Sequence, residues 1–493
     1  MGAVNQDDGD KLGGAGSNIS SDISNDERGE QAAHTVDVLV IGAGLAGYCA
    51  AIEAAAFGAS VLLIEKRSAV GGSTILSGGS FAFAGTDEQR AAGLEDSAAT
   101  LEADLLKVGD QANDPALVRA YADNQADTYR WLKRIGVRFS DVFVAGGQSV
   151  PRSIRTVPAE LIRLLDAAAQ STGRVELRLS CGALRLIRDP ANGKVQGAIV
   201  TTADGGRQRI HARRGIVLAS GGFSRSEELL GLFAPAQRLA QRMGGAGNTG
   251  DGLRMAWALG GGMRDMGYIK GTFGSHPSAT PETYKPLLAI YRGAIAVNRQ
   301  GKRFVNEAIS YKKIGDACLL QDGALAYQVF DQTTFERSEA DIPAFDIRDA
   351  HAQGRLEQAD TLQALAQRIG VDAAALRDTV SRYNRDVADG RDTEFGRSGL
   401  SNEDFGRLQP LETPPFYAYP CTSVVLATYC GLAVDAAMRV RDVYGEPIEG
   451  LYAAGEVVGG LHGAAYMSGS ANGKAAIFGR LAGRAVSARA GVA

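Results

Sequence analysis

The feature that most restricts the fold is a short apolar run that ends in a glycine-rich turn. Residues 36–41 (VDVLVI) are apolar and β-branched, as in a buried parallel strand, and GAGLAG follows directly at 42–47. An Ala-rich stretch at 48–57 favours a helix, and SVLLIE at 60–65 predicts a second strand. This order of strand, GxGxxG turn, helix and strand ending in an acidic residue predicts a βαβ unit that binds a dinucleotide.

Each residue of this motif has its own physical reason. Gly42 allows the tight turn, Gly44 lets the backbone approach a pyrophosphate, and Gly47 lets the helix pack on the strand. Glu65 suits the hydroxyl groups of a ribose and would repel a 2′-phosphate. A second GxGxxG at 245–250 is not preceded by a strand pattern, so we expect a single dinucleotide. One such site in a chain of 493 residues favours a tightly held FAD, and the alternative is a glycine-rich turn in another α/β fold.

Further glycines and hydroxyl groups lie where an extended cofactor would run. GGST at 71–74 and SGG at 77–79 follow the second strand, and AGE at 454–456 follows a later strand. The last helix begins near residue 470, where its N-terminus could stabilise negative charge on a reduced flavin. The residues expected to bind FAD are Gly42, Gly44, Ala46, Gly47, Glu65, Lys66, Gly72, Ser73, Thr74, Ser77, Gly78, Gly79, Gly221, Asp251, Gly455, Glu456, Ser470 and Ala471.

The order of these patterns predicts an α/β fold with a Rossmann-like FAD-binding domain that is split in sequence. Residues 1–33 are polar and predict a disordered tail. Residues 34–245 and 351–493 are expected to form the two parts of the FAD-binding domain. Residues 246–350 mix short strands and helices without a βαβ rhythm, which predicts an inserted α+β capping domain. In the last part, Asp372 is expected to cap the second of two helices.

Composition and cysteine usage exclude several classes of function. Lys and Arg number 52 against 56 Asp and Glu, a net charge of −4, which argues against a nucleic-acid partner. The five cysteines form no CxxC pair and the five histidines no HxxxH pair, so we expect no metal site and a reducing, cytoplasmic location. No apolar run is long enough to predict a membrane span. Because no haem, iron–sulfur or nicotinamide motif is present, an external electron acceptor is expected.

Together these motifs make the chain resemble the fumarate reductase/succinate dehydrogenase flavoprotein superfamily. The stretches that carry the resemblance, besides the glycine motifs above, are VLASGGF at 217–223, NTGDG at 248–252, AVNRQGKRFVNE at 296–307 and GLYAAGEVVGGLHGA at 450–464. The resemblance implies a split FAD domain and a capping domain that closes over the substrate. It also implies redox chemistry at a carbon–carbon bond beside a carbonyl group.

The resemblance also indicates where this chain departs from the members that act on dicarboxylates. The substituted positions are Thr272 and Ala427 in place of histidines, Tyr311 and Tyr466 in place of arginines, and Ala289 in place of a glutamate. Arg292 is retained. The histidine that binds flavin covalently in membrane-bound members corresponds to Ser73, so FAD is expected to be non-covalent.

These substitutions change the charge that the substrate can carry. A buried dicarboxylate needs at least two fixed cations, because an unpaired buried carboxylate is strongly destabilising. Here we expect a neutral cyclic ketone or ketosteroid, since Tyr311 and the YMS sequence at 466–468 are similar to the arrangement in 3-ketosteroid dehydrogenases of the Δ4-(5α) type and related cyclic-ketone desaturases. Two alternatives stay open: a reductase of an unsaturated carboxylic acid that holds one carboxylate on Arg292, and a non-catalytic FAD-fold binding protein.

The candidate catalytic residues are Tyr311, Tyr466, Ser468 and Arg292. In the predicted α,β-dehydrogenation, an ionised Tyr311 would take the α-proton while the β-carbon gives a hydride to flavin N5; the reverse steps would reduce an enone. Because the pKa of a free tyrosine is about 10, Arg292 or Lys312 is expected to lower that of Tyr311. Tyr466 and Ser468 would hydrogen-bond the ketone oxygen, and the two tyrosines could exchange roles.

Overall fold

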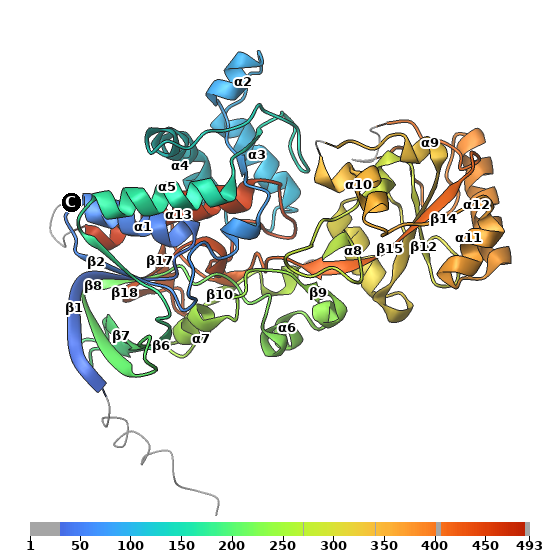
Figure 1. The fold of residues 1–493 in the computed structure, drawn as a ribbon. Coiled ribbons are helices and arrows are strands. Elements are labelled where there is room, and N and C mark those ends of the chain that lie inside the picture. The colour runs from blue at the N-terminus through green and yellow to red at the C-terminus, as the bar shows by residue number, and fades with distance from the viewer. Residues whose placement is uncertain (1–29, 270, 341, 401–405, 489–493) are drawn as a thin grey trace, which may run out of the picture.

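The computed structural model describes residues 30–269, 271–340, 342–400 and 406–488. These residues form two lobes, a larger one around a mostly parallel sheet and a smaller one around a mostly antiparallel sheet (Figure 1). Most of the tail predicted at 1–33 lies outside the described residues. Residues 30–33 already belong to strand β1 (Glu30–Ile41), so the prediction of disorder is wrong for them.

The sheet of the larger lobe has eight strands, six of which follow the order β17-β18-β8-β1-β2-β5. Its strands are β1, β2 (Val61–Ile64), β5 (Val175–Arg178), β6 (Ala183–Arg188), β7 (Val195–Thr201), β8 (Arg207–Leu218), β17 (Arg439–Arg441) and β18 (Pro447–Ala453). Strand β1 pairs in parallel with β2 and β8, and β18 pairs in parallel with β8. Because β18 comes from the end of the chain, the FAD-binding fold is split in sequence as predicted.

Helices cover one face of this sheet, and small residues bring them close together. The helices are α1 (Leu45–Ala56), α4 (Pro115–Arg134), α5 (Pro158–Ser171) and α13 (Ser470–Ser487). Figure 1 shows α1, α5 and α13 side by side over the sheet, with α7 (Asp251–Trp257) on its other side. In α13, a Cβ on Gly479 would lie 2.4 Å from the carbonyl oxygen of Ala46. Only glycine therefore permits this close packing of α13 on α1.

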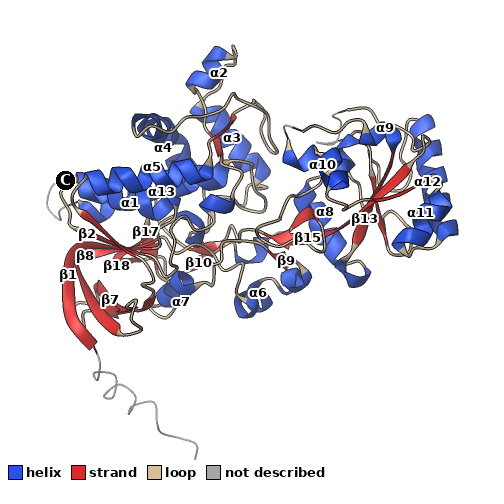
Figure 2. Ribbon diagram, viewed as in Figure 1, coloured by secondary structure: helices blue, strands red, loops and turns tan. Residues whose placement is uncertain are grey.

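The smaller lobe is built on a second sheet with helices packed around it (Figure 2). Its strands are β9 (Gln241–Arg242), β11 (Thr272–Ser275), β12 (Ile295–Asn298), β13 (Ala326–Asp331), β14 (Glu357–Ala359) and β15 (Phe416–Val425). Its main helices are α8 (Tyr311–Leu319), α11 (Leu362–Ile369) and α12 (Ala373–Ala388). Strand β15 is central, since β11, β13, β14 and β9 all pair with it. The Asp372 side chain accepts a hydrogen bond of 2.7 Å from the Ala375 N–H and caps α12, as predicted.

The second sheet extends beyond the boundary at residue 350 that we placed by sequence. Strands β14 and β15 pair with each other, and β15 pairs with β13 along Ala326 to Asp331. Residues 357–425 thus contribute strands and helices to the smaller lobe, and they do not return to the larger one. The boundary was misplaced because the sequence pattern of the two helices α11 and α12 is the same whichever domain they pack against.

A fully buried ion cluster braces the smaller lobe next to α8. Arg303 donates hydrogen bonds to Glu307 at 2.9 and 2.6 Å and to Asp392 at 2.9 Å. Arg397 reaches the same Glu307 carboxylate at 3.4 Å and also donates to the Ile290 carbonyl oxygen at 2.6 Å. The cluster therefore ties the 303–307 segment, which leads directly into α8, to the loop at 392–397.

Shorter elements connect these parts. The remaining helices are α2 (Asp87–Ala91), α3 (Ala98–Val108), α6 (Glu227–Phe233), α9 (Gln332–Phe335) and α10 (Ile347–Ala352), and the remaining strands are β3 (Ser80–Ala82), β4 (Ser153–Arg155), β10 (Met263–Arg264) and β16 (Gly431–Leu432). The 3-10 turns are η1 (Thr74–Leu76), η2 (Pro235–Leu239), η3 (Met266–Tyr268), η4 (Ala289–Arg292), η5 (Asp322–Ala324), η6 (Pro343–Phe345) and η7 (Gly455–Val457).

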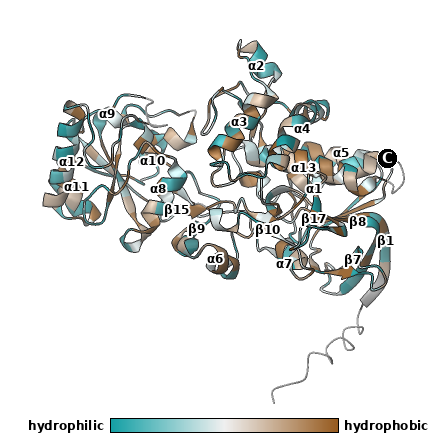
Figure 3. Ribbon diagram, turned by 180° about the vertical axis from the view of Figure 1, so that it is seen from behind, coloured by the Kyte–Doolittle hydropathy of each residue, from teal (hydrophilic) through white to brown (hydrophobic). Residues whose placement is uncertain are grey.

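Each lobe has its own hydrophobic core, and polar residues lie mainly on the outside (Figure 3). One large core fills the larger lobe, and two smaller cores lie against the sheet of the smaller lobe. Strand β2 is buried along its whole length, which explains its unbroken apolar sequence. Within the described residues, every helix is too short or too polar to cross a bilayer.

Candidate active site

A single cavity of about 960 Å³ runs from the carboxyl ends of β1 and β2 to the smaller lobe. One end is lined by the glycine-rich turn, with Gly42 and Gly44, and by Glu65. The other end is lined by residues of the smaller lobe and of the loops that join the lobes, among them Thr272 and Tyr311. Parallel sheets place their binding sites at this edge, so the position agrees with the predicted dinucleotide site.

The glycine-rich turn leaves open backbone at the N-terminus of α1. A Cβ on Gly42, whose φ is +109°, would lie 2.4 Å from the Ala219 carbonyl oxygen, and one on Gly47 would lie 1.8 Å from the Gly42 carbonyl oxygen. A Cβ on Gly44 would meet only the Gly71 carbonyl oxygen, at 3.8 Å. Gly42 and Gly47 therefore serve the packing of strand and helix. Gly44 lines the cavity, where its missing side chain leaves room for a phosphate at the helix N-terminus.

Two charged groups at this end are held in place by the protein. The Glu65 carboxylate accepts hydrogen bonds from the backbone N–H groups of Ala43 at 3.1 Å and Arg67 at 2.9 Å. The Lys66 ammonium lies 2.6 Å from the Asp251 carboxylate. All three predicted side chains, Glu65, Lys66 and Asp251, line the cavity. Their geometry fits the hydroxyl groups and phosphates of a dinucleotide.

The middle of the cavity is lined by a buried polar network around Glu456. This carboxylate accepts hydrogen bonds from the Thr428 N–H at 3.0 Å, the Asn248 side chain at 3.0 Å and the Ser73 hydroxyl at 3.3 Å. Burial raises the pKa of Glu456, and these hydrogen bonds and nearby Lys474 oppose the rise. A buried carboxylate with several polar neighbours, facing the cavity, fits the ribityl hydroxyls of a flavin.

The predicted cofactor residues divide into those that line the cavity and those that do not. The lining set is Gly42, Gly44, Ala46, Glu65, Lys66, Gly72, Ser73, Thr74, Ser77, Gly78, Gly221, Asp251, Gly455, Glu456 and Ala471. The three others, Gly47, Gly79 and Ser470, lie behind this surface. A Cβ on Gly79 would lie 1.9 Å from the Thr156 carbonyl oxygen, and the Ser470 hydroxyl donates to the Met467 carbonyl oxygen at 2.7 Å. Gly79 therefore serves packing, and the Ser470 hydroxyl is engaged with the segment that precedes α13.

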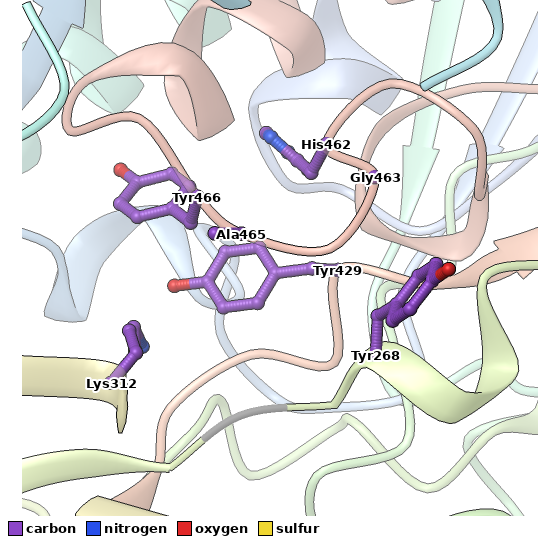
Figure 4. Close-up of a pocket in the computed structure, with 7 residues that line it drawn as sticks. All are labelled: Tyr268, Lys312, Tyr429, His462, Gly463, Ala465 and Tyr466. Atoms are coloured by element: carbon purple, nitrogen blue, oxygen red, sulfur yellow. The ribbon is translucent and has the colours of Figure 1, made fainter. Parts of the chain in front are cut away.

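Four tyrosines line the end of the cavity near the smaller lobe: Tyr284, Tyr311, Tyr429 and Tyr466. The rings of Tyr429 and Tyr466 stack with centroids 4.7 Å apart, and Figure 4 shows their hydroxyl groups pointing to the same side. The Tyr466 hydroxyl accepts a hydrogen bond of 3.0 Å from the Gly469 N–H. Its own O–H is thus free to donate toward a ligand.

The Tyr311 hydroxyl is a neutral phenol. Burial raises the pKa of Tyr311, and a hydrogen bond to Ser468 only partly opposes the rise. Our expectation of a lowered pKa is therefore wrong, since desolvation penalises the phenolate. Ser468 does not line the cavity and acts through this contact with Tyr311.

Arg292 does not line the cavity. Its guanidinium lies 2.7 Å from the Glu339 carboxylate and 3.7 Å from the ring centroid of Phe345. The prediction that it acts on the substrate or on Tyr311 needs correction, because its charge is already paired away from the phenols. Three other arginines do line the cavity: Arg67 next to Lys66, Arg155 over the Phe143 ring at 4.3 Å, and Arg225, which donates to the Gly244 carbonyl oxygen at 2.8 Å.

Lys312 is the buried cation beside the four phenols. Its ammonium donates a hydrogen bond of 2.7 Å to the Thr272 hydroxyl and lies 5.0 Å from the ring centroid of Tyr429. Burial lowers the pKa of Lys312 to about 7, opposed by Asp316 one turn further along α8. Sequence reasoning considered Lys312 only as a neighbour of Tyr311 and overlooked Tyr284 and Tyr429. The signal available was that Lys312 follows the substituted position 311 directly.

No group of three or more His, Cys, Asp or Glu side chains that could hold a metal ion occurs in the described part of the chain. The buried His462 lies near the phenols, with its ring centroid 5.5 Å from that of Tyr466. Burial lowers the pKa of His462 well below its usual value, and the positive charges of Lys474 and Lys312 add to this effect. It is thus a neutral imidazole, consistent with a position beside the cofactor.

Comparison with known proteins agrees with this architecture. A family model described as an FAD-binding domain matches residues 37–471. The fumarate reductase (cytochrome) of Shewanella frigidimarina is 35% identical over 429 residues, which is 85% of this chain and 72% of the relative. Its name states fumarate as the compound that it reduces.

Two solved structures extend the similarity to the whole fold. The open conformation of a flavocytochrome c3 fumarate reductase has a TM-score of 0.80 and 32% identity, and the match covers 92% of this chain and 78% of that one. The 3-ketosteroid-Δ4-(5α)-dehydrogenase of Rhodococcus jostii RHA1, in complex with 4-androstene-3,17-dione, has a TM-score of 0.74 and 27% identity, and the match covers 92% and 97% of the two chains.

Proposed function

This chain belongs to the FAD-binding family that includes the fumarate reductases. It is therefore an FAD-dependent oxidoreductase that acts on carbon–carbon bonds, and we propose that its substrate is a neutral ketone, cyclic or steroidal. The proposed reaction is dehydrogenation of the CH–CH bond next to the carbonyl group, or reduction of the matching enone. Bound FAD supplies a hydride acceptor in one direction and a hydride donor in the other.

One observation carries the proposal. The positions at which the dicarboxylate-binding members are expected to hold histidines and arginines are Thr272, Tyr311, Ala427 and Tyr466, and all four line the cavity. The retained Arg292 is paired with Glu339 instead. None of these four side chains carries a guanidinium or imidazole, and Lys312 beside them supplies one cation for the two carboxylates of a dicarboxylate, which is unfavourable in a buried site. Phenols and apolar groups suit a ketone.

The two phenols support binding of a carbonyl oxygen. Tyr466 accepts the Gly469 N–H with its oxygen and keeps its O–H for the ligand. Tyr311 stays neutral at ordinary pH and can donate as well. Two donors that meet on one oxygen would stabilise the enolate charge that develops in the transition state, and each donor is worth about 10²–10³ in rate. Ser468 would orient Tyr311 through their hydrogen bond.

The similarity to the ketosteroid dehydrogenase supports the same substrate class, since that protein was solved with a neutral diketone. The electrons then need an external acceptor. FAD is proposed to be non-covalent, because Ser73 occupies the position of the covalently attached histidine and its hydroxyl is engaged with Asn248 at 2.9 Å and with Glu456.

A second candidate function is reduction of an unsaturated monocarboxylic acid. We first expected Arg292 to hold the carboxylate, but it is paired with Glu339. Lys312 would have to take this role, as the buried cation at the phenolic end.

An anaerobic assay separates these candidates. The yellow protein is mixed with saturated cyclic ketones and steroid ketones, and, after reduction with dithionite, with enones and with fumarate-type acids. The proposal expects the ketones to bleach the flavin and the enones to restore its colour. Reaction with dicarboxylic acids alone would refute the neutral-ketone proposal, and reaction with none would favour a binding protein.

The phenol assignment is tested with Tyr311→Phe. We expect the rate of flavin reduction to fall about 10²–10³-fold, because one hydrogen-bond donor to the developing oxyanion is lost. Tyr444→Phe is the matched control, since Tyr444 is 88% exposed and far from any partner that the proposal uses. A Tyr311→Phe variant with the rate of the control would show that this phenol is dispensable.

A further inference from the structure

Lys312 occupies an unusual position for an amine. It is the second residue of α8, its side chain lies almost completely inside the protein at 4% exposure, and it faces the cavity. Only one of its three N–H bonds has a partner, the Thr272 hydroxyl at 2.7 Å. Within the residues that the structure describes, no carboxylate lies within ion-pair distance of it. The ammonium form thus keeps two N–H donors for a ligand, and the neutral amine keeps one N–H and a lone pair.

The groups that face Lys312 leave its protonation state finely balanced. The phenol rings of Tyr311 and Tyr429, with centroids 5.6 and 5.0 Å away, are neutral, because burial raises the pKa of both. His462 is a neutral imidazole across the site, and Asp316 on the same helix favours the ammonium. Burial outweighs Asp316 and lowers the pKa of Lys312 to about 7. Free amine and ammonium are then both abundant near neutral pH.

Lys312 also lines a second, smaller hollow. A niche of about 10 Å³, lined by Tyr268, Lys312, Tyr429, His462, Gly463, Ala465 and Tyr466, lies beside the main cavity (Figure 4). Its volume suits one water molecule. Tyr268 on its wall is 39% exposed, so the niche lies close to the surface. Lys312 thus borders two hollows, the main cavity and this niche.

We propose that Lys312 is the catalytic residue that takes the α-proton of the ketone during dehydrogenation and returns it during reduction. This inference rests on the proposed function. In the oxidative direction the α-carbon–hydrogen bond breaks and its proton bonds to the neutral Nζ. The electron pair left on the α-carbon forms the double bond as the β-hydrogen leaves as hydride to FAD. The ammonium then releases its proton to solvent, and the two electrons pass to the external acceptor.

Lys312 is preferred over Tyr311 as the base because its pKa of about 7 lies near the working pH, whereas that of Tyr311 is raised. A general base is most effective when its pKa lies near that pH, and buried lysines are tuned to this range. A buried phenol with a raised pKa carries a negligible fraction of phenolate and serves better as a hydrogen-bond donor. Thr272, which accepts a hydrogen bond from Nζ, would direct the amine and acts as a positioning residue.

The experiment uses the FAD-loaded protein and whichever saturated ketone, or saturated acid in its place, bleaches the wild-type flavin. Limiting rates and apparent dissociation constants are measured by stopped flow from pH 5.5 to 9. For the wild type we expect the rate to rise through a pKa of about 7 and then level off, as a neutral-amine base requires. Lys312→Met should lose 10²–10⁴-fold in rate, with little change in dissociation constant and without the inflection. Lys313→Met, which alters the exposed neighbour on α8, is the matched control and should match the wild type.

A smaller variant adds a positive test. Lys312→Ala should regain rate when primary amines are added, in proportion to the free-base concentration. An unchanged rate and inflection in Lys312→Met would overturn the proposal. So would a loss confined to the dissociation constant, because that result describes a carboxylate anchor. If only acids bleach the wild type, the neutral-ketone function fails, while the same variants still decide the role of Lys312 with the acid.

If no compound reacts, the protonation of Lys312 is measured directly by NMR. Lysines are dimethylated with ¹³C-formaldehyde, and their resonances are followed against pH. One resonance that titrates near pH 7 should be present in the wild type and absent in Lys312→Arg. Its absence from the wild type would also overturn the proposal.

Discussion

Two glycines of one motif are predicted to fail in different ways when each is replaced by alanine. In Gly47→Ala the new Cβ would lie 1.8 Å from the Gly42 carbonyl oxygen, against about 3.4 Å for an ordinary contact, so strand and helix must separate by about 1.6 Å. Both sides of this contact are backbone, so no side chain can move away. The destabilisation should therefore reach the upper end of the range for overpacking, about 3 kcal/mol. At roughly 2 °C per kcal/mol for a domain of this size, the apoprotein should melt about 6 °C lower.

In Gly44→Ala the new methyl group meets only the Gly71 carbonyl oxygen at 3.8 Å and otherwise points into the cavity. The apoprotein should therefore melt within about 1 °C of the wild type. The affinity for FAD should fall about 10–100-fold, because a backbone N–H can no longer approach the phosphate closely, a loss of about 1–3 kcal/mol.

The assay combines thermal unfolding of the apoprotein with titration of FAD by flavin fluorescence. Gly231→Ala serves as the control for the substitution itself: it lies in α6 and its Cβ would be 3.7 Å from the Arg238 side chain, so both readouts should match the wild type or improve slightly. The reasoning is refuted if Gly47→Ala melts like the wild type, or if Gly44→Ala destabilises the apoprotein as much as Gly47→Ala does.

The remaining predictions concern the smaller lobe and the attachment of FAD. Arg303→Met should destabilise the protein by about 3–5 kcal/mol in urea unfolding, since it removes the cation paired with the buried Asp392 and leaves Glu307 only its longer contact to Arg397; the exposed Arg382→Met should cost less than about 1 kcal/mol. Burial raises the pKa of Asp392, but hydrogen bonds, chiefly from Arg303, lower it from 3.8 to about 2. Its stabilisation, on the order of 2 kcal/mol, is therefore complete above pH 3.8 and lost as the pH falls through 2, a pH dependence of unfolding that Asp392→Asn should remove. Acid precipitation should release all FAD into the supernatant, and yellow colour retained in the pellet would contradict the Ser73 assignment.

The nucleotide end of the site could be predicted because its determinants are local. The strand, turn, helix and second strand lie within 30 residues (36–65), and the close contacts of Gly42 and Gly47 are those that the spacing of the motif implies. Even here the sequence did not separate residues that line the cavity from residues behind it. Gly79 and Ser470 are residue types that suit a cofactor site, but Gly79 packs against the Thr156 carbonyl oxygen and the Ser470 hydroxyl donates to the Met467 carbonyl oxygen.

The substrate end depended on contacts between distant segments. Arg292 looked like the remaining substrate cation until the fold placed Glu339 and Phe345 against it. Lys312 was expected only to lower the pKa of Tyr311, and the fold places its ammonium against Thr272. A pKa depends on burial and on neighbours in space, so the raised pKa of Tyr311 could not be read from its sequence position.

By itself, the sequence determined the βαβ unit, its division around an inserted domain and the loss of the guanidinium and imidazole groups of the dicarboxylate enzymes. These features depend on residue types and on short spacings between them, and both can be read directly from the sequence. Only the tertiary structure decided which charged side chains are paired and which face the cavity. Pairing and desolvation arise when residues far apart in the sequence, such as Thr272, Lys312 and Tyr429, meet around one cavity.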